Sequence, residues 1–231
     1  IDNPSLLKKV LEFQPDAILV FGWNFKSHLH LIRKLKGRIP IWFRGDSTLL
    51  DETLNVKTVL RRIALTWVYR HIDKAFYVGS ANKAYFLKHG LKENQLVFAP
   101  HAIDNERFTD EKESKNYEQQ AMTWRKKLEY KENDLVVLFA GKFQAIKQPD
   151  MLAEALLYAN TKRKQKLHLL FIGNGPLEED LKNRYGKESC IQFLPFQNQS
   201  QMPVIYRLSD VYCLPSKSET WGLAVNEAIA C

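Results

Sequence analysis

The stretch "DLVVLFAGKFQAIKQPDMLAEALLYANTKRKQKLHLLFIG" (residues 134–173) decides the fold class. It opens with an apolar run at 134–141, continues with an amphipathic pattern at 148–160, and closes with a second apolar run at 167–173. Short runs of β-branched and large apolar residues predict strands, whereas the longer periodic pattern predicts a helix. A strand–helix–strand unit of this kind is typical of a parallel sheet with a right-handed crossover.

The same alternation continues on both sides of this unit. Further strands are predicted at 16–22, 39–43, 75–79, 95–100, 190–195 and 210–216. Helices are predicted between them, including 25–36, 55–72 and a last one from about Leu223. The repeated pattern predicts an α/β protein with parallel sheets throughout.

A charged and polar segment separates the two halves. We interpret residues 111–133 as a linker with a lead-in helix, between Rossmann-like domains at 1–110 and 134–231 that face a cleft. The first half begins in the middle of the pattern and the last helix is cut short. We therefore expect both domains to be partial in this chain.

Composition restricts the class of protein but does not choose a function. Apolar residues make up 45% and charged residues 26% of the chain, as in soluble globular proteins, and the longest apolar runs are too short to span a bilayer. The three cysteines have no metal-binding spacing, so we expect no metal site and a cytoplasmic location. The net charge of +8 indicates an anionic partner, which could be nucleic acid, a membrane face or a phosphorylated small molecule.

Ligands of open α/β sheets bind beyond the carboxyl ends of the strands, so the loops that follow strands are the first places to search. Lys142 and Lys147 follow the strand at 134–141, where two ammonium groups suit a diphosphate and two solvated lysines are the alternative. Gly173 and Gly175 follow the next strand. They allow the backbone to approach a ligand, although a plain tight turn explains them equally well.

Two carboxylates surround the start of the last predicted helix. Glu219 lies in the loop after the strand at 210–216, and Glu227 lies about one turn into the helix. Three backbone amides between them are expected to be unpaired, those of Trp221, Gly222 and Leu223. Such amides attract anions, and carboxylates accept hydrogen bonds from vicinal hydroxyls. The alternative is a helix-capping Glu219 and a surface Glu227.

Together these motifs resemble a known family. The order G-K-x4-K, then G-x-G-P after a strand, then P-S-x2-E-x-x-G-x4-E-A-x-A looks like the donor domain of retaining glycosyltransferases of the GT-B fold, family 4 (glycosyl transferases group 1). The resemblance covers most of 134–231, and "IDNERF" (103–108) is similar to the family's interdomain segment. Residues 77–108 resemble the last part of the acceptor domain. The resemblance implies a GT-B protein that is incomplete at both ends.

The resemblance also implies roles for the matching residues. Lys142 and Lys147 would bind the donor diphosphate, although the family usually has arginine where this chain has Lys142. Glu219 would hold the donor sugar hydroxyls, and Glu227 would hold the ribose diol. The implied catalytic set is Glu219, Lys142 and Lys147. The implied donor-binding set is Gly141, Gly173, Gly175, Pro195, Phe196, Trp221, Gly222, Leu223 and Glu227. Pro195 and Phe196 would lie near the nucleotide base, although the family commonly has glycine at the position of Pro195.

The first half supplies acceptor-side candidates at the ends of its predicted strands. These are Trp23, Arg44, Asp46 and His101. A tryptophan at the edge of the core and a histidine that caps its loop are the alternatives for Trp23 and His101.

The resemblance implies a hexosyltransferase that moves a sugar from a nucleotide-sugar donor to a glycan, lipid-linked or small-molecule acceptor with retention of configuration. The nucleoside diphosphate sugar would be a co-substrate, with no other cofactor and no metal. Rival interpretations are another GT-B enzyme such as a sugar-nucleotide epimerase, a fragment without activity, and a basic nucleic-acid-binding protein. The last of these lacks a face of interleaved basic and aromatic residues, so we expect no nucleic-acid partner.

The helix predicted at 55–72 leaves a membrane contact open. It carries Lys57, Arg61, Arg62 and Arg70, which could touch anionic lipid at the inner face of a membrane. Ordinary packing of the helix with solvated arginines is the interpretation that the sequence favours.

Overall fold

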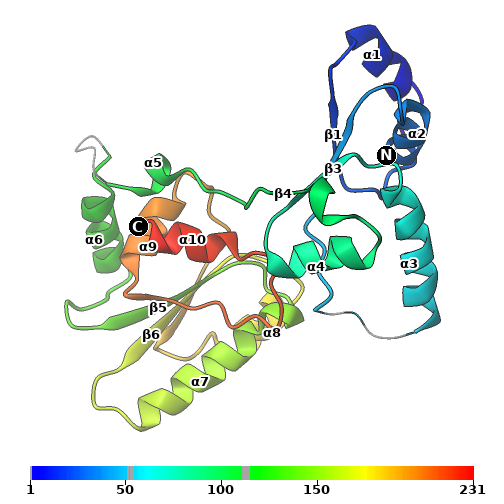
Figure 1. Ribbon diagram of the computed structural model, residues 1–231. Helices are drawn as coiled ribbons and strands as arrows, with labels where there is room; N and C mark the ends of the chain where they lie inside the picture. Colours follow the sequence, from blue (N-terminus) through cyan, green and yellow to red (C-terminus); the bar gives the residue numbers. More distant parts are fainter. Residues whose placement is uncertain (1, 51, 53–54, 111–114) are drawn as a thin grey trace. The chain divides into compact units, whose positions relative to one another are not determined.

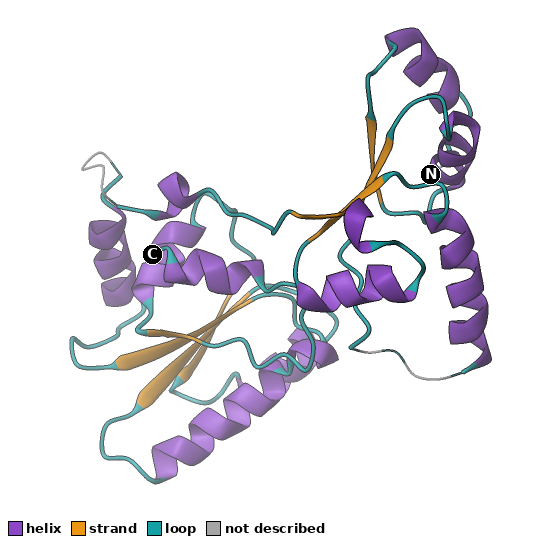
Figure 2. Cartoon of the chain, viewed as in Figure 1, coloured by secondary structure: helices purple, strands orange, loops and turns teal. Residues whose placement is uncertain are grey.

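The structure is a computed structural model that describes residues 2–50, 52, 55–110 and 115–231. The chain divides into two compact units, Ile1–His101 and Ala102–Cys231 (Figure 1). Each unit has a parallel sheet with helices packed on it, as the alternating pattern predicts (Figure 2). The α/β fold class predicted from the sequence is therefore confirmed.

The sheet of the first unit has the order β1-β2-β3-β4 in the described residues. Its strands are β1 (Ile18–Phe21), β2 (Ile41–Arg44), β3 (Lys74–Tyr77) and β4 (Leu96–Phe98). Its helices are α1 (Leu6–Phe13), α2 (Lys26–Leu35), α3 (Val56–Tyr69) and α4 (Ser80–Lys88), with a 3₁₀ turn η1 (Glu93–Gln95). All three strand pairs are parallel, so the carboxyl ends of β1, β2, β3 and β4 lie along one edge of the sheet.

Aromatic packing holds this unit together. Phe43 of β2 meets Tyr69 of α3 and Phe86 of α4 edge to face, with ring centroids 5.4 and 6.0 Å apart. Asn82 of α4 is almost fully buried, and its amide donates to the carbonyl of Ser47 while its oxygen accepts from the backbone of Val78. The loop that follows β2 is therefore tied to the underlying helix.

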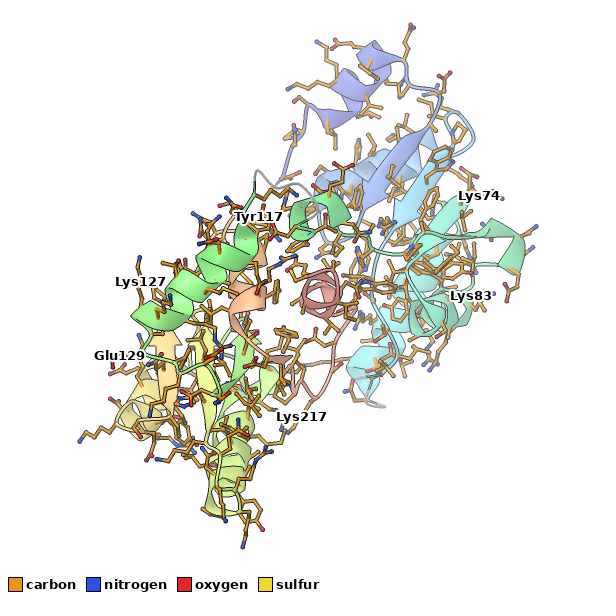
Figure 3. The ribbon with its side chains drawn as sticks, turned by 90° about the vertical axis from the view of Figure 1, so that its left-hand side faces the viewer. Lys74, Lys83, Tyr117, Lys127, Glu129 and Lys217 are labelled. Atoms are coloured by element: carbon orange, nitrogen blue, oxygen red, sulfur yellow. The ribbon has the colours of Figure 1, made fainter. Side chains whose placement is uncertain are left out.

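The sheet of the second unit has the order β7-β6-β5-β8 in the described residues. Its strands are β5 (Leu135–Ala140), β6 (Leu167–Ile172), β7 (Ile191–Leu194) and β8 (Val211–Tyr212). Its helices are α5 (Asn105–Phe108), α6 (Tyr117–Lys127), α7 (Pro149–Thr161), α8 (Glu178–Tyr185), α9 (Met202–Leu208) and α10 (Leu223–Ile229), with a 3₁₀ turn η2 (Ala145–Lys147). Tyr117 and Lys127 mark the ends of α6 in Figure 3.

The central strands of this sheet are buried on both faces. Leu138 and Leu170 belong to one core cluster with α6 and α9, while Phe139 and Phe171 belong to another with α7 and α8. A strand covered on both sides needs a continuous apolar run, which is what 134–141 and 167–173 provide.

Two boundaries differ from the sequence-based expectation. β8 has two paired residues, where a strand was predicted over 210–216, because it pairs with β5 alone and Pro215 has no backbone N–H to continue a ladder. Residues 102–110 pack with the second unit, although the predicted first domain ran to 110. Phe108 is buried in the second core, and its carbonyl accepts from Arg207 of α9. Residues 111–114 of the predicted linker lie outside the described part of the chain.

Candidate functional site

A cavity of about 490 Å³ lies at the carboxyl edge of the second sheet. Its walls come from the loops after β5, β6 and β7 and from α9 and α10, and include Gly141, Lys142, Gly173, Asn174, Phe196, Gln199, Tyr206 and Glu227. Its volume is in the range of small-molecule sites, and polar side chains converge on it. A hollow of about 560 Å³ in the first unit, between α1, β1 and α2, is mainly apolar and brings no such group of polar side chains together.

Glu227 is the carboxylate that α10 presents to this cavity. The hydroxyl of Tyr206 donates to its Oε2 at 2.8 Å, and the amide of Gln199 donates to its Oε1 at 2.8 Å. Each carboxylate oxygen can accept a second hydrogen bond, so both keep an acceptor position for a ligand hydroxyl. Burial and then the bond to Glu227 raise the pKa of Tyr206, which keeps its phenol protonated as a donor.

Lys142 lies on the wall formed by the loop after β5. It lines the same cavity as Glu227, and its ammonium has no ion-pair partner in the described residues. A cation and a fixed carboxylate in one cavity can bind a ligand that carries both an anionic group and hydroxyls.

Lys147 and Glu219 are paired with each other and do not line this cavity. The ammonium of Lys147 donates to Glu219 Oε1, and the hydroxyl of Ser216 donates to the same oxygen at 2.7 Å. About a quarter of each charged side chain is exposed. The backbone N–H of Lys217, labelled in Figure 3, donates to the carbonyl of Ile146, which holds the loop after β8 against η2.

Gly173 and Gly175 are required by the packing of two loops. A Cβ at Gly173 would lie 1.9 Å from the carbonyl oxygen of Gly141, and a Cβ at Gly175 would lie 2.6 Å from that of Phe143. Both glycines have positive φ, +146° and +154°. The N–H of Phe143 donates to the carbonyl of Asn174 at 2.9 Å. The two glycines thus shape the cavity wall that carries Lys142.

The start of α10 contradicts the alternative in which Glu219 caps this helix. The N-cap is Gly222, with φ +78°, and no side chain caps it. Glu227 is not a plain surface glutamate either, because it is half-buried and accepts two hydrogen bonds. Trp221 is half-buried and Leu223 is exposed beside the N-cap.

Phe196 is an exposed aromatic ring at the cavity. Its side chain is 64% exposed. The neighbouring Pro195 does not line the cavity, and the carbonyl of Pro195 accepts a hydrogen bond from the side-chain amide of Gln197. A large exposed ring on a ligand cavity offers a face on which a planar ligand group can stack.

The acceptor-side candidates lie near the carboxyl edge of the first sheet. Arg44 ends β2, and its guanidinium donates to the carbonyl of Pro100 at 3.5 Å, next to His101. Trp23 follows β1 and packs against the core, so the core-edge interpretation describes its position. Asp46 is exposed on the loop that Asn82 holds.

Sequence reasoning missed the residues that hold the predicted ones in place. They are Gln199, Tyr206, Ser216 and Asn82. The sequence does contain a signal for Tyr206, because it lies between the strands predicted at 190–195 and 210–216, where the alternating pattern predicts a helix. Only the fold shows that this helix lies beside α10.

Comparison with known proteins finds a family that the second unit resembles. Residues 120–231 match the family described as glycosyl transferases group 1. The D-inositol 3-phosphate glycosyltransferase of Gordonia bronchialis is 32% identical over 112 residues, which are 43% of this chain and 24% of that protein. The protein of that name from Saccharomonospora viridis is 36% identical over 110 residues, 42% of this chain and 26% of that protein. The chain thus spans about a quarter of these relatives.

Solved structures show that the resemblance in fold extends over the whole chain. Anabaena HepE in complex with UDP has a TM-score of 0.73 at 19% identity, over 98% of this chain and 61% of that one. The α,α-trehalose-phosphate synthase (UDP-forming) of Burkholderia xenovorans, in complex with glucose-6-phosphate, has a TM-score of 0.72 at 11% identity, over 97% and 58%. The chain shares the α/β fold of these structures, and its residues 120–231 match the glycosyl transferases group 1 family.

Proposed function

We propose that this chain is part of a hexosyltransferase that binds a nucleoside diphosphate sugar in its second unit and transfers the sugar with retention of configuration. The observation that carries the proposal is the Glu227 carboxylate, which Tyr206 and Gln199 orient toward a cavity that also holds Lys142. A carboxylate with one open acceptor position on each oxygen suits the ribose diol, and a lysine suits the diphosphate. Phe196 offers its exposed ring to the base.

The comparisons support the nucleotide part of this proposal. The Anabaena neighbour was solved with UDP and with UDP-glucose, and the curated relatives are named as glycosyltransferases. Residues 120–231, which match the glycosyl transferases group 1 family, contain the cavity. Uracil nucleotides are therefore the first donors to test.

The chemistry that we propose separates the sugar from the diphosphate on the face where the acceptor attacks. The bond between the anomeric carbon and the diphosphate oxygen breaks, a bond to the acceptor oxygen forms, and the acceptor proton passes to the departing phosphate. Lys142 stabilises the negative charge that develops on the diphosphate, and electrostatic preorganisation of this kind is commonly the largest contribution to catalysis. Lys147 contacts the diphosphate only after its ion pair with Glu219 has broken. Glu219 is then able to accept hydrogen bonds from the sugar hydroxyls.

We place the acceptor at the carboxyl edge of the first sheet, where Arg44, Asp46 and His101 supply polar groups. A glycan, a lipid-linked sugar or a small phosphorylated polyol would each present a hydroxyl there. The cysteines Cys190, Cys213 and Cys231 are free, in keeping with a cytoplasmic enzyme.

The test is binding of UDP, GDP and ADP, and of their glucose conjugates, measured by calorimetry. Wild-type protein should bind at least one of them, and Glu227→Gln should weaken that binding about tenfold or more because a carboxylate is a stronger acceptor than an amide. Glu179→Gln on α8 is the matched control, since it makes the same substitution at an exposed position and should bind as wild type does. Absence of binding by every nucleotide, or equal effects of the two substitutions, would contradict the proposal.

A further inference from the structure

Helix α3 carries apolar side chains on two opposite sides. Leu65, Val68 and Tyr69 are buried against the first sheet. A second row points away from the unit and consists of Val56, Val59, Leu60, Ile63 and Trp67, which are between 42% and 76% exposed. The spacing of three or four residues places this row, here named the α3 stripe, on one side of the helix. The stripe lies opposite the buried residues and contributes little to the core.

Single exposed apolar residues are normal, but a continuous row along a helix is characteristic of an interaction surface. α3 is the cyan helix at the margin of the first unit in Figure 1. Ordinary packing, the interpretation favoured by the sequence, accounts for the inner side of α3 and leaves the stripe unexplained.

The charges around the stripe are positive. No Asp or Glu occurs from Asn55 to Ile72, and Lys57 and Arg70 lie near the two ends of the helix. The guanidinium of Arg33, from α2, lies over the ring of Trp67 at 5.4 Å.

The distribution of charge between the units points in the same direction. Residues 1–101 contain 16 Lys and Arg against 8 Asp and Glu, whereas residues 102–231 contain 18 of each. The whole net charge of +8 therefore lies in the unit that carries the stripe, and the proposed nucleotide site lies in a unit with no net charge. An excess of cations beside apolar side chains complements an anionic lipid surface.

We infer that α3 docks the first unit on an anionic membrane, with the stripe among the lipid headgroups and the neighbouring cations at the lipid phosphates. Trp67, with a cation over its ring, is a side chain suited to the membrane–water interface. α3 lies in the plane of that interface, because its 14 residues are too few to cross a bilayer. No helix in the described residues is long and apolar enough to do so. A second copy of this chain fits less well, because pairing two stripes would bring two sets of cations together with no acidic residue on α3 to neutralise them.

The experiment is co-sedimentation of the chain with vesicles of phosphatidylcholine alone and of phosphatidylcholine with one part in three of phosphatidylglycerol. The wild-type chain should bind the anionic vesicles, release them at high salt, and bind the neutral vesicles far less. Ile63→Asn should weaken binding by about five- to tenfold, because it removes one apolar group from the interface without adding charge. Met122→Asn, at an exposed position of α6 in the second unit, is the matched control and should bind as wild type does.

Quenching by brominated lipid locates the contact and does not depend on the strength of binding. Tryptophan quenching should be largely lost in Trp67→Phe. Equal binding by Ile63→Asn and Met122→Asn, or wild-type quenching in Trp67→Phe, would overturn the inference. So would a dimer, detected by sedimentation velocity, that Ile63→Asn dissociates while vesicle binding stays unchanged.

Discussion

The hydrogen bond between Tyr206 and Glu227 provides the most direct test of how the cavity is built. Tyr206→Phe removes the hydroxyl that donates to Glu227 Oε2 at 2.8 Å and leaves the buried ring in place. A hydrogen bond to a charged group contributes about 1.5–3 kcal/mol to stability. Glu227 faces a cavity that admits water, so water replaces part of this bond, and we expect the free energy of unfolding to fall by about 1 kcal/mol.

Tyr206→Phe should weaken ligand binding by more than it lowers the free energy of unfolding. Without the Tyr206 hydroxyl, Gln199 alone among the described residues donates to the carboxylate, and the orientation that presents both oxygens to a ribose diol is lost. We expect the affinity for UDP to fall about tenfold, which corresponds to about 1.4 kcal/mol. Calorimetric titration with UDP measures the affinity, and urea unfolding measures the stability.

Tyr212→Phe is the matched control. Its hydroxyl donates to the carbonyl of Ala140 at 3.2 Å, in the same core cluster, and not to Glu227. This substitution should lower stability by a similar amount, about 1 kcal/mol, and leave the affinity for UDP unchanged. If Tyr206→Phe and Tyr212→Phe bind UDP equally well, Tyr206 has only a structural role and the reasoning about Glu227 is refuted.

Three further predictions concern the fold. Gly173→Ala should lower the melting temperature so far that little folded protein remains, because the new Cβ would overlap the carbonyl of Gly141. Gly37→Ala also has a positive φ but meets open space, so it should lower the free energy of unfolding by only about 1 kcal/mol. In urea unfolding, Leu65→Ala should lower the free energy of unfolding by about 3 kcal/mol, and Ile63→Ala should lower it by less than about 0.5 kcal/mol. Equal losses would mean that the α3 stripe is part of the core. Burial lowers the pKa of His89 below 6.5, so the unfolded chain binds more protons and stability should fall as pH drops through 6.5. Thermal unfolding at pH 5 and 7.5 should show a smaller difference in His89→Gln than in wild type.

Elements with a single buried stripe or a continuous apolar run could be predicted from the sequence. β5 and β6 are buried on both faces, so their apolar runs predict them almost to the residue. β8 is different, because only two residues pair with β5 before the chain turns away toward Pro215. Strand propensity continues through 213–214, and the N–H of Cys213 still donates to the carbonyl of Leu138, but Pro215 has no N–H with which to continue the ladder.

The candidate site shows the same division. The positions of Lys142 and Glu227 follow from the order of strands and loops, because the carboxyl ends of parallel strands meet at one edge. The partners of Glu227 do not follow from it, since Gln199 lies 28 and Tyr206 21 positions away in the sequence. The ion pair of Lys147 and Glu219 does not follow from the order of strands either, because the resemblance implies that both side chains contact the donor.

α3 shows why periodicity alone leaves a function undecided. Its buried and exposed apolar rows both recur at helical spacing, so the sequence pattern cannot tell which row enters the core. The contacts of the arginines between the two rows show which row faces the core. Arg61 donates to the hydroxyl of Tyr85 at 3.0 Å, and Arg62 lies 3.9 Å from the carboxylate of Glu52, so both reach back over the unit. The row on the inner side is covered, and the other row stays exposed.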